Sequence, residues 1–271
     1  MKQLEIKLLL QAIKEAYGYD FSEYRIASLQ RRLELYLASS GKEHLSELIY
    51  MILQDSAQFH SLLNTLTISI TEMFRDPPLF KFIRDELIQK LATFPVINVW
   101  SAGCSTGLEA YSLAILFEEA GLYRRTQIYG TDINPRLLKE ASAGIYPEDE
   151  FAAYSENYIQ SGGSHSLSEY FHMNYRKGLI NEKLKSHVSF FSHNLVTDSN
   201  FIEAQMIMCS NVLIYFNQDL QRKVLNLFYN SLHNFGYLVL GMKERVPDVM
   251  LGKMFEKLSP HLPVYKKVPH G

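Results

Sequence analysis

The first part of the chain places its apolar residues at the spacing of a helix. From Leu4 to about Asn64 they recur every three or four positions, with breaks at Gly18 and at residues 39–41. This period collects the apolar residues on one face of each helix. The pattern therefore predicts a small all-helical N-terminal domain over residues 1–70.

From about residue 95 the pattern changes to short β-rich runs separated by helical segments. The expected strands are 95–101, 126–131, 187–192, 205–210 and 237–241, and the expected helices are at about 106–120, 134–142 and 217–231. Strands that alternate with such helices are typical of βαβ units. The predicted fold class is therefore α/β, with a doubly wound parallel sheet over residues 95–271. Ligands are expected beyond the carboxyl ends of its strands.

Two segments lie outside this alternation of strands and helices. Residues 71–94 are expected to form a linker and a helix, with Asp76 as the N-cap, Pro77 at the first helical position and an end near Ala92. Residues 145–186 are longer than a normal crossover and contain several glycines. We therefore expect an excursion from the sheet there.

Composition narrows the classes of function. Apolar residues make up 47% of the chain and charged residues 21%, as in ordinary globular proteins. The formal charge of -2 argues against a nucleic-acid partner. No run approaches the roughly 18 apolar residues of a membrane span, so a cytoplasmic protein without membrane insertion is expected. The two cysteines and nine histidines show no disulfide or metal-ligand spacing, and no metal is expected.

The stretch VWSAGCSTGLEA leads from a predicted strand through two glycines into a predicted helix. A phosphate loop is excluded, because Gly107 is followed by Leu108 and Glu109 instead of lysine. A dinucleotide site would need a third glycine, and Glu109 would repel a pyrophosphate. S-adenosylmethionine has no phosphate, and Asp132 at the end of the next strand is placed to accept from its ribose hydroxyls. The alternative is an ordinary turn with a solvent-facing aspartate.

Two further stretches lie where a doubly wound enzyme keeps its chemistry. MCSNVLIYF places Asn211 near the carboxyl end of the fourth strand, with Tyr215 close behind. An aromatic ring attracts a sulfonium by about 0.5 to 2 kcal/mol, so Tyr215 is a candidate wall of the reacting centre; the alternative is core packing. In SITEMFRD, Arg75 can bind a carboxylate through two parallel hydrogen bonds.

Together these motifs resemble the chemotaxis receptor glutamate methyltransferases, the CheR family. VWSAGCSTGLEAYSLA is similar to the donor-binding loop of that family, GTDINPRLLKEASAGIY to its acidic ribose motif, and CSNVLIYF to its fourth-strand motif. SITEMFRD, YLVLGMKE and LPVYKK agree in order along the chain. The resemblance implies a Rossmann-like class I methyltransferase that converts S-adenosyl-L-methionine to S-adenosyl-L-homocysteine. It further implies a protein-glutamate O-methyltransferase that acts on the cytoplasmic helices of methyl-accepting chemotaxis receptors.

The resemblance also assigns residues. The residues that it implies for donor binding are Ser69, Thr71, Arg75, Gly103, Glu109, Asp132, Asn194, Leu195, Ser210 and Asn211. Arg75 and Tyr215 are implied in catalysis, Arg75 by holding a carboxylate and Tyr215 by flanking the sulfonium. The sequence leaves open whether Arg75 holds the carboxylate of the donor or that of the acceptor.

Four positions depart from the family pattern. Ser69, Met73, Leu108 and Ser210 stand where the family usually has asparagine, phenylalanine, an acid and arginine. The chain is therefore expected to be a divergent member that is still active. A missing cation at Ser210 would change how a carboxylate is held.

The N-terminal domain is the expected receptor-docking part. Its second helix carries Arg25, Arg31 and Arg32, which can dock acidic receptor helices and recruit the protein to chemoreceptor arrays; the alternative is a solvated face. The segment 171–188 leaves little room for a three-stranded insert, so we predict weak or absent binding of a receptor-tail pentapeptide. The alternatives to receptor methylation are a methyltransferase for a different protein or small molecule, and a non-catalytic donor-binding scaffold.

Overall fold

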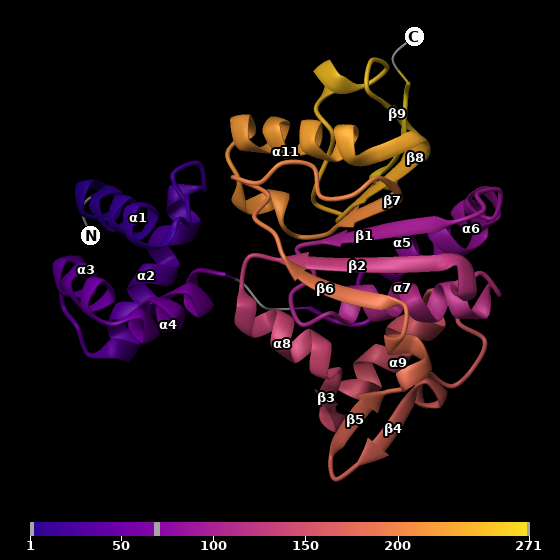
Figure 1. Cartoon of the computed structure of the whole chain (residues 1–271), viewed down its shortest axis with the longest axis horizontal. Coiled ribbons are helices and arrows are strands. Elements are labelled where there is room, and N and C mark those ends of the chain that lie inside the picture. Colours follow the sequence, from indigo (N-terminus) through magenta and orange to yellow (C-terminus); the bar gives the residue numbers. More distant parts are fainter. Residues whose placement is uncertain (1–2, 68–70, 270–271) are drawn as a thin grey trace. The chain divides into compact units, whose positions relative to one another are not determined.

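The computed structural model describes residues 3–67 and 71–269, and these divide into two compact units. The first unit contains the described residues up to 67 together with Ile214–Val224, and the second contains the described residues from 71 to 213 and from 225 onward. Figure 1 follows the chain by colour through both. The predicted fold class is confirmed, because an all-helical N-terminal part precedes an α/β part.

Within residues 3–67 the chain forms the helices that its apolar spacing predicts. They are α1 (Gln3–Tyr17), α2 (Ile26–Ser40), α3 (Leu45–Gln54) and α4 (Ser56–Leu66). Each buries one apolar stripe, and Leu9, Leu33, Leu48 and Leu63 contribute to the shared core. Gly41 ends α2 with φ 67°, a left-handed conformation that glycine adopts without steric cost.

The sequence pattern assigns Ile214–Val224 to the α/β domain, but the structure groups this segment with the helices. The Arg25 amide donates to the Tyr215 carbonyl at 2.8 Å. The Tyr24 and Phe216 rings meet edge to face, with centroids 4.9 Å apart. Backbone and ring contacts thus attach the segment to the start of α2, and such long-range contacts leave no local sequence signal.

The second unit is built on a seven-stranded sheet of order β6-β2-β1-β7-β8-β10-β9. The strands are β1 (Ile97–Ala102), β2 (Thr126–Asp132), β6 (Val188–Ser192), β7 (Ala204–Cys209), β8 (Leu232–Leu240), β9 (Phe255–Lys257) and β10 (Val264–Lys267). The first five of these are parallel to one another, and β10 runs antiparallel to its two neighbours, β8 and β9. Figure 1 shows β7, β1, β2 and β6 side by side. The winding reverses at β1, between β2 and β7, where open α/β sheets bind ligands.

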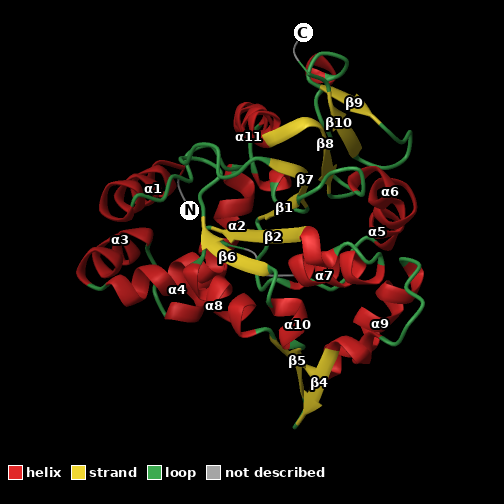
Figure 2. Cartoon of the chain, turned by 45° about the vertical axis from the view of Figure 1, so that its right-hand side comes forward, coloured by secondary structure: helices red, strands yellow, loops and turns green. Residues whose placement is uncertain are grey.

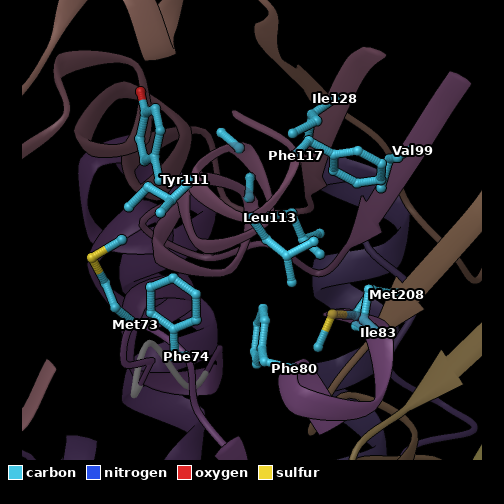
Figure 3. Close-up of a cluster of buried hydrophobic side chains, with 14 of the residues drawn as sticks. Met73, Phe74, Phe80, Ile83, Val99, Tyr111, Leu113, Phe117, Ile128 and Met208 are labelled. Carbon is cyan, nitrogen blue, oxygen red and sulfur yellow. The ribbon is translucent and has the colours of Figure 1, made fainter. Parts of the chain in front are cut away.

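Both faces of the sheet are covered, which explains why β1 is buried along almost its whole length. Val99 belongs to a buried cluster with Phe117 of α7 (Leu108–Glu119) and with Phe74, as Figure 3 shows. The next residue, Trp100, points to the other face. Its ring meets Phe228 of α11 (Gln218–Ser231) edge to face, with centroids 5.5 Å apart.

The helix predicted from Pro77 to about Ala92 is present but irregular. A π-helical turn, Ile83–Leu87, joins α5 (Pro77–Phe82) to α6 (Ile88–Leu91). Pro77 begins the helix as predicted. Asp76 is the N-cap residue as predicted, but its backbone is left-handed at φ 58° and its side chain makes no cap hydrogen bond.

The excursion from the sheet contains a second, three-stranded antiparallel sheet of order β3-β5-β4. Its strands are β3 (Ile145–Pro147), β4 (Phe171–Asn174) and β5 (Lys177–Ile180), and the helices around them are α8 (Pro135–Ala143), α9 (Phe151–Gln160) and α10 (Glu182–Lys185). Figure 2 shows β4 and β5 as a short hairpin. The expectation of too little room for three strands is wrong, because β3 comes from outside the segment 171–188. The prediction of weak receptor-tail binding loses that support.

Candidate functional site

The two glycines of the turn after β1 permit close contacts that no other residue would allow. Gly103 has φ 78° and Gly107 has φ 85°. A Cβ atom on Gly103 would lie 2.4 Å from the Val212 side chain, and one on Gly107 would lie 2.9 Å from Ala141 of α8. The turn therefore packs directly against the segment after β7 and against α8.

The end of β2 holds this turn in place. The Thr131 carbonyl accepts from the Gly103 amide at 2.8 Å. The Asp132 carboxylate accepts from the Ser105 amide through Oδ2 and from the Asn134 amide through Oδ1, both at 2.9 Å. Asp132 is only 9% exposed, so the alternative of a solvent-facing aspartate is wrong. Burial raises the pKa of Asp132 above its usual value, and the amide hydrogen bonds counteract that rise.

Glu109 lies partly buried in the first turn of α7. The Ser101 hydroxyl donates to its Oε1 at 2.7 Å. Burial raises the pKa of Glu109 to about 7 and Glu244 adds to the rise, whereas Ser101, Ser210 and Arg75 lower it. The fold thus brings Arg75 and Ser210 within electrostatic reach of Glu109. A ligand cation beside this carboxyl would stabilise its ionised form.

Non-glycine residues with left-handed backbone occur at several positions of this region. Phe74, Asp76, Ser105 and Asn211 have φ of 50°, 58°, 52° and 62°. Strained conformations of this kind cost about 1 to 3 kcal/mol and persist where the surrounding structure enforces them. Arg75 lies between two of them, and Phe74 is fully buried. Core packing therefore fixes the backbone on either side of Arg75.

Asn211 lies two residues beyond the end of β7. Its amide donates to Glu244 Oε2 at 3.0 Å. Its side-chain Oδ1 is buried, and within the described residues it has no hydrogen-bond partner. A buried acceptor without a donor is costly, and it is suited to a ligand that supplies the donor.

Glu244, which the sequence pattern did not indicate as a site residue, is hydrogen-bonded to Asn211. Its Oε2 also accepts from the Gly241 amide at 2.8 Å, so one oxygen atom joins the turn after β8 to Asn211. The only sequence signal was its place at the end of YLVLGMKE, directly after a predicted strand.

The other residues that the resemblance implies for donor binding are Ser69, Thr71, Asn194 and Leu195. The His193 amide donates to the Asp132 carbonyl at 3.2 Å, which places the Asn194–Leu195 pair next to the end of β2. Thr71 is partly buried at the start of the segment that leads to Arg75. Ser69 lies outside the described residues.

Tyr215 belongs to the helical unit, where its ring packs against Arg32. The guanidinium carbon lies 4.5 Å from the ring centroid, a cation–π contact. The alternative of plain core packing for Tyr215 therefore describes only part of its environment, because the side chain remains partly exposed.

The structure contradicts one of the predicted docking residues. Arg32 is only 4% exposed, and its guanidinium donates to the Leu66 carbonyl, so it is unavailable to a partner. The reason is helical spacing: Arg32 shares the inward face of α2 with Leu29. Arg25 and Arg31 are exposed.

The fold and the site define a class. A parallel sheet has a glycine turn at its winding reversal and an acid at the end of β2 that is hydrogen-bonded to that turn, and the buried Asn211 Oδ1 has no donor among the described residues. This is typical of a site for a nucleoside-containing ligand. Residues 69–260 match the family described as CheR methyltransferase, SAM binding domain, and residues 4–67 match the CheR methyltransferase, all-alpha domain. The chain therefore belongs to the CheR methyltransferase family and uses S-adenosylmethionine.

Relatives resemble the chain along nearly its whole length. A Pseudomonas putida protein named putative methyltransferase Cher3 is 45% identical over 97% of this chain and 97% of its own. The chemotaxis protein methyltransferase of Borreliella burgdorferi is 28% identical over 89% of this chain and 88% of its own. The chemotaxis protein methyltransferase of Escherichia coli is 26% identical over 90% of this chain and 85% of its own.

The residues present fit S-adenosylmethionine. Its ammonium group, ribose hydroxyls and adenine amino group are all hydrogen-bond donors, and the site offers acceptors at Glu109, Asp132 and Asn211 Oδ1. Among the described residues, no helix has the length and apolar character needed to cross a membrane.

Proposed function

We propose that this methyltransferase esterifies glutamate side chains on the cytoplasmic helices of methyl-accepting chemotaxis receptors. The observation that carries the proposal is that the likeness to chemotaxis methyltransferases extends through both units, the all-helical one included. A methyltransferase for a small molecule would not need the helical part. The corresponding activity is that of a protein-glutamate O-methyltransferase.

The polar groups around the donor site have distinct proposed roles. Glu109 accepts from the donor ammonium, because an ionised carboxylate in a partly buried place gains most from a cation. Asp132 accepts from the ribose hydroxyls with the lone pairs that its two amide bonds leave over. Asn211 Oδ1 accepts from a further donor group of the ligand.

The chemistry requires alignment more than acid–base catalysis. A glutamate acceptor is ionised at neutral pH and needs no general base. One carboxylate oxygen must lie about 3 Å from the donor methyl, in line with sulfur, with water excluded. The carboxylate and sulfonium charges cancel as the methyl group moves. Tyr215 is proposed to flank the sulfonium.

Arg75 is proposed to hold a carboxylate, and one variant decides which. If Arg75→Met weakens S-adenosylhomocysteine binding in calorimetry, Arg75 holds the donor. If donor affinity is kept and only the KM for the receptor rises, it holds the acceptor. An effect on neither would remove Arg75 from the site.

Exposed Arg25 and Arg31 remain the proposed docking residues of the helical unit. Arg31→Glu reverses the charge of an exposed side chain and should raise the KM for an acidic receptor helix without changing donor affinity. Point variants are preferable to deletion of residues 1–66, because deletion would also remove the partners of Ile214–Val224.

The central experiment incubates the protein with methyl-labelled donor and receptor cytoplasmic fragments. The expected product is a base-labile methyl ester on receptor glutamates. Receptor fragments with the methylated glutamates replaced by alanine, and the Glu109→Gln enzyme, are the controls. Base-stable label, or label on a different protein or a small molecule only, would reject receptor methylation. Donor binding without any transfer would favour a scaffold.

A further inference from the structure

Glu244 has a place in the fold that the proposed chemistry does not use. It lies in the turn after β8, with 4% of its surface exposed. Its amide donates to the Gly241 carbonyl at 2.8 Å, which closes the turn. A buried carboxylate is costly unless hydrogen bonds satisfy it, so its partners deserve a functional explanation.

One oxygen atom of Glu244 connects the ends of two neighbouring strands. Oε2 accepts from the Gly241 amide at 2.8 Å and from the Asn211 amide at 3.0 Å. The strands concerned, β7 and β8, are parallel and pair up to Cys209 and Leu240. The Glu244 carboxylate thus links the two chain segments just beyond Cys209 and Leu240, where the backbone pairing of β7 with β8 has ended.

Gly241 leaves the space in which this connection is made. A Cβ atom at Gly241 would lie 2.8 Å from Glu244 Oε2 and 2.9 Å from the Asn211 nitrogen. Any side chain there would push the carboxylate away from Asn211. Glycine at this position and the buried acid three residues later therefore depend on each other.

The connection fixes the segment that faces the glycine turn. Asn211 has φ 62°, a conformation that needs support from its surroundings. The adjacent Val212 side chain occupies the space above Gly103, 2.4 Å from where a Cβ would be. A shift of the Asn211 backbone would move both the Asn211 side chain and the packing of the donor turn.

We propose that Glu244 is a positioning residue of the donor site, which acts by holding the Asn211 backbone so that Oδ1 faces the bound S-adenosylmethionine. This rests on the proposed donor contact of Asn211. The positioned atom is the buried Oδ1 that has no partner within the described chain.

The charge of Glu244 supplies an independent readout. The groups that act on Glu109 are Ser101, Ser210 and Arg75, which lower its pKa, and Glu244, which raises it. Replacement of Glu244 by glutamine removes a negative charge and keeps an acceptor oxygen. It should therefore lower the pKa of Glu109 by a direct charge effect, and this shift shows that the substituted side chain still lies beside the site.

The test measures S-adenosylhomocysteine affinity of the full chain by calorimetry between pH 6 and 8. Glu244→Ala should weaken binding at least tenfold. Glu244→Gln should restore part of that loss and shift the midpoint of the pH profile downward. Glu256→Gln, an exposed acid on β9, is the matched control and should change neither quantity.

A double-variant cycle tests whether Glu244 acts through Asn211. The effects of Glu244→Ala and Asn211→Ala on affinity should be far from additive. Additive effects, or wild-type affinity in a folded Glu244→Ala or Asn211→Ala protein, would each overturn the proposal. If Glu244→Ala does not fold, the same cycle is measured with Glu244→Gln and Asn211→Ala, and additive effects there overturn it equally. Because no receptor is present, failure of receptor methylation leaves these results unaffected.

Discussion

Helix α7 carries a glutamate near each end, and the two differ in their hydrogen-bond and ion-pair partners. Glu119, in its last turn, is satisfied by the protein: Arg84 donates at 2.5 Å, and the Tyr170 and Tyr158 hydroxyls both donate to Oε1. Its side chain is 7% exposed. Glu109, in the first turn, has the Ser101 hydroxyl at 2.7 Å and a pKa raised to about 7.

The helix dipole alone would favour the ionised form at Glu109 and disfavour it at Glu119. A negative charge gains about 0.3 to 1 kcal/mol at a helix N-terminus and loses similarly at the C-terminus. Burial outweighs this at Glu109, because burial is the largest cause of its raised pKa. Glu119 therefore joins α7 to its neighbours through several side-chain partners, whereas Glu109 keeps a pKa raised to about 7 despite its hydrogen bond from Ser101.

The largest expected effect is on the structural acid. Glu119→Ala should lower the free energy of unfolding by about 3 kcal/mol, because it leaves the mostly buried Arg84 guanidinium without its carboxylate. Urea unfolding measures this. Glu118→Ala, which breaks only an ion pair with the exposed Lys183, should cost at most about 1 kcal/mol. Equal effects of the two changes would contradict the distinction.

The functional acid should show the opposite profile. Glu109→Gln should weaken S-adenosylhomocysteine binding by about 10- to 100-fold, the value of a charged hydrogen bond, without lowering the free energy of unfolding. Calorimetry and urea unfolding on the same sample measure both. Glu140→Gln, an exposed acid on α8, is the control. Unchanged affinity would show that the donor ammonium lies elsewhere.

Glu109 should also make donor binding depend on pH. Only its ionised form attracts the ammonium, so affinity should rise with pH through about 7 and fall about tenfold per unit well below it. Stability moves the other way: because the folded pKa is raised from 4.5, the contribution of Glu109 is fully present below 4.5 and is lost as pH rises through about 7. Titration of affinity and of unfolding free energy between pH 5 and 8 checks both signs, and Glu109→Gln should remove both trends.

The smallest expected effect concerns the hydroxyl beside Glu109. Ser101 lowers the pKa of Glu109, so Ser101→Ala should move the midpoint of donor binding upward by less than about one pH unit. The pH dependence of calorimetric affinity measures the shift. In a Glu109→Gln background the same change should have no effect on the pH profile; a persistent shift would mean that another group titrates.

Local pattern was enough for much of the fold. The predicted strands 95–101, 126–131 and 205–210 match β1, β2 and β7 within about two residues, because apolar runs and glycine turns act over short distances. Asp76 occupies the predicted N-cap position, but the local pattern did not indicate its left-handed backbone or the absence of a side-chain cap hydrogen bond. The sequence pattern did not predict β3, because a strand of three residues is too short to show an alternation of apolar and polar residues.

The candidate site also has features that the sequence predicts and features that it does not. The glycine turn, Glu109 and Asp132 stand out in the sequence, because a turn that lets a ligand approach needs glycine and an acid at a strand end has a recognisable place. The burial of Arg32 and the grouping of Ile214–Val224 with the helices did not stand out. Both depend on residues distant in the chain.

Membership of the CheR methyltransferase family can be recognised from the sequence alone, since the motifs that indicate it are local. Which acids have their hydrogen-bond partners within the protein depends on the tertiary structure. Glu109, Glu119 and Glu244 look alike in the sequence. Burial and partners distant in the chain distinguish them: Glu119 pairs with Arg84, Glu244 accepts from the Asn211 amide, and Glu109 has a pKa raised to about 7.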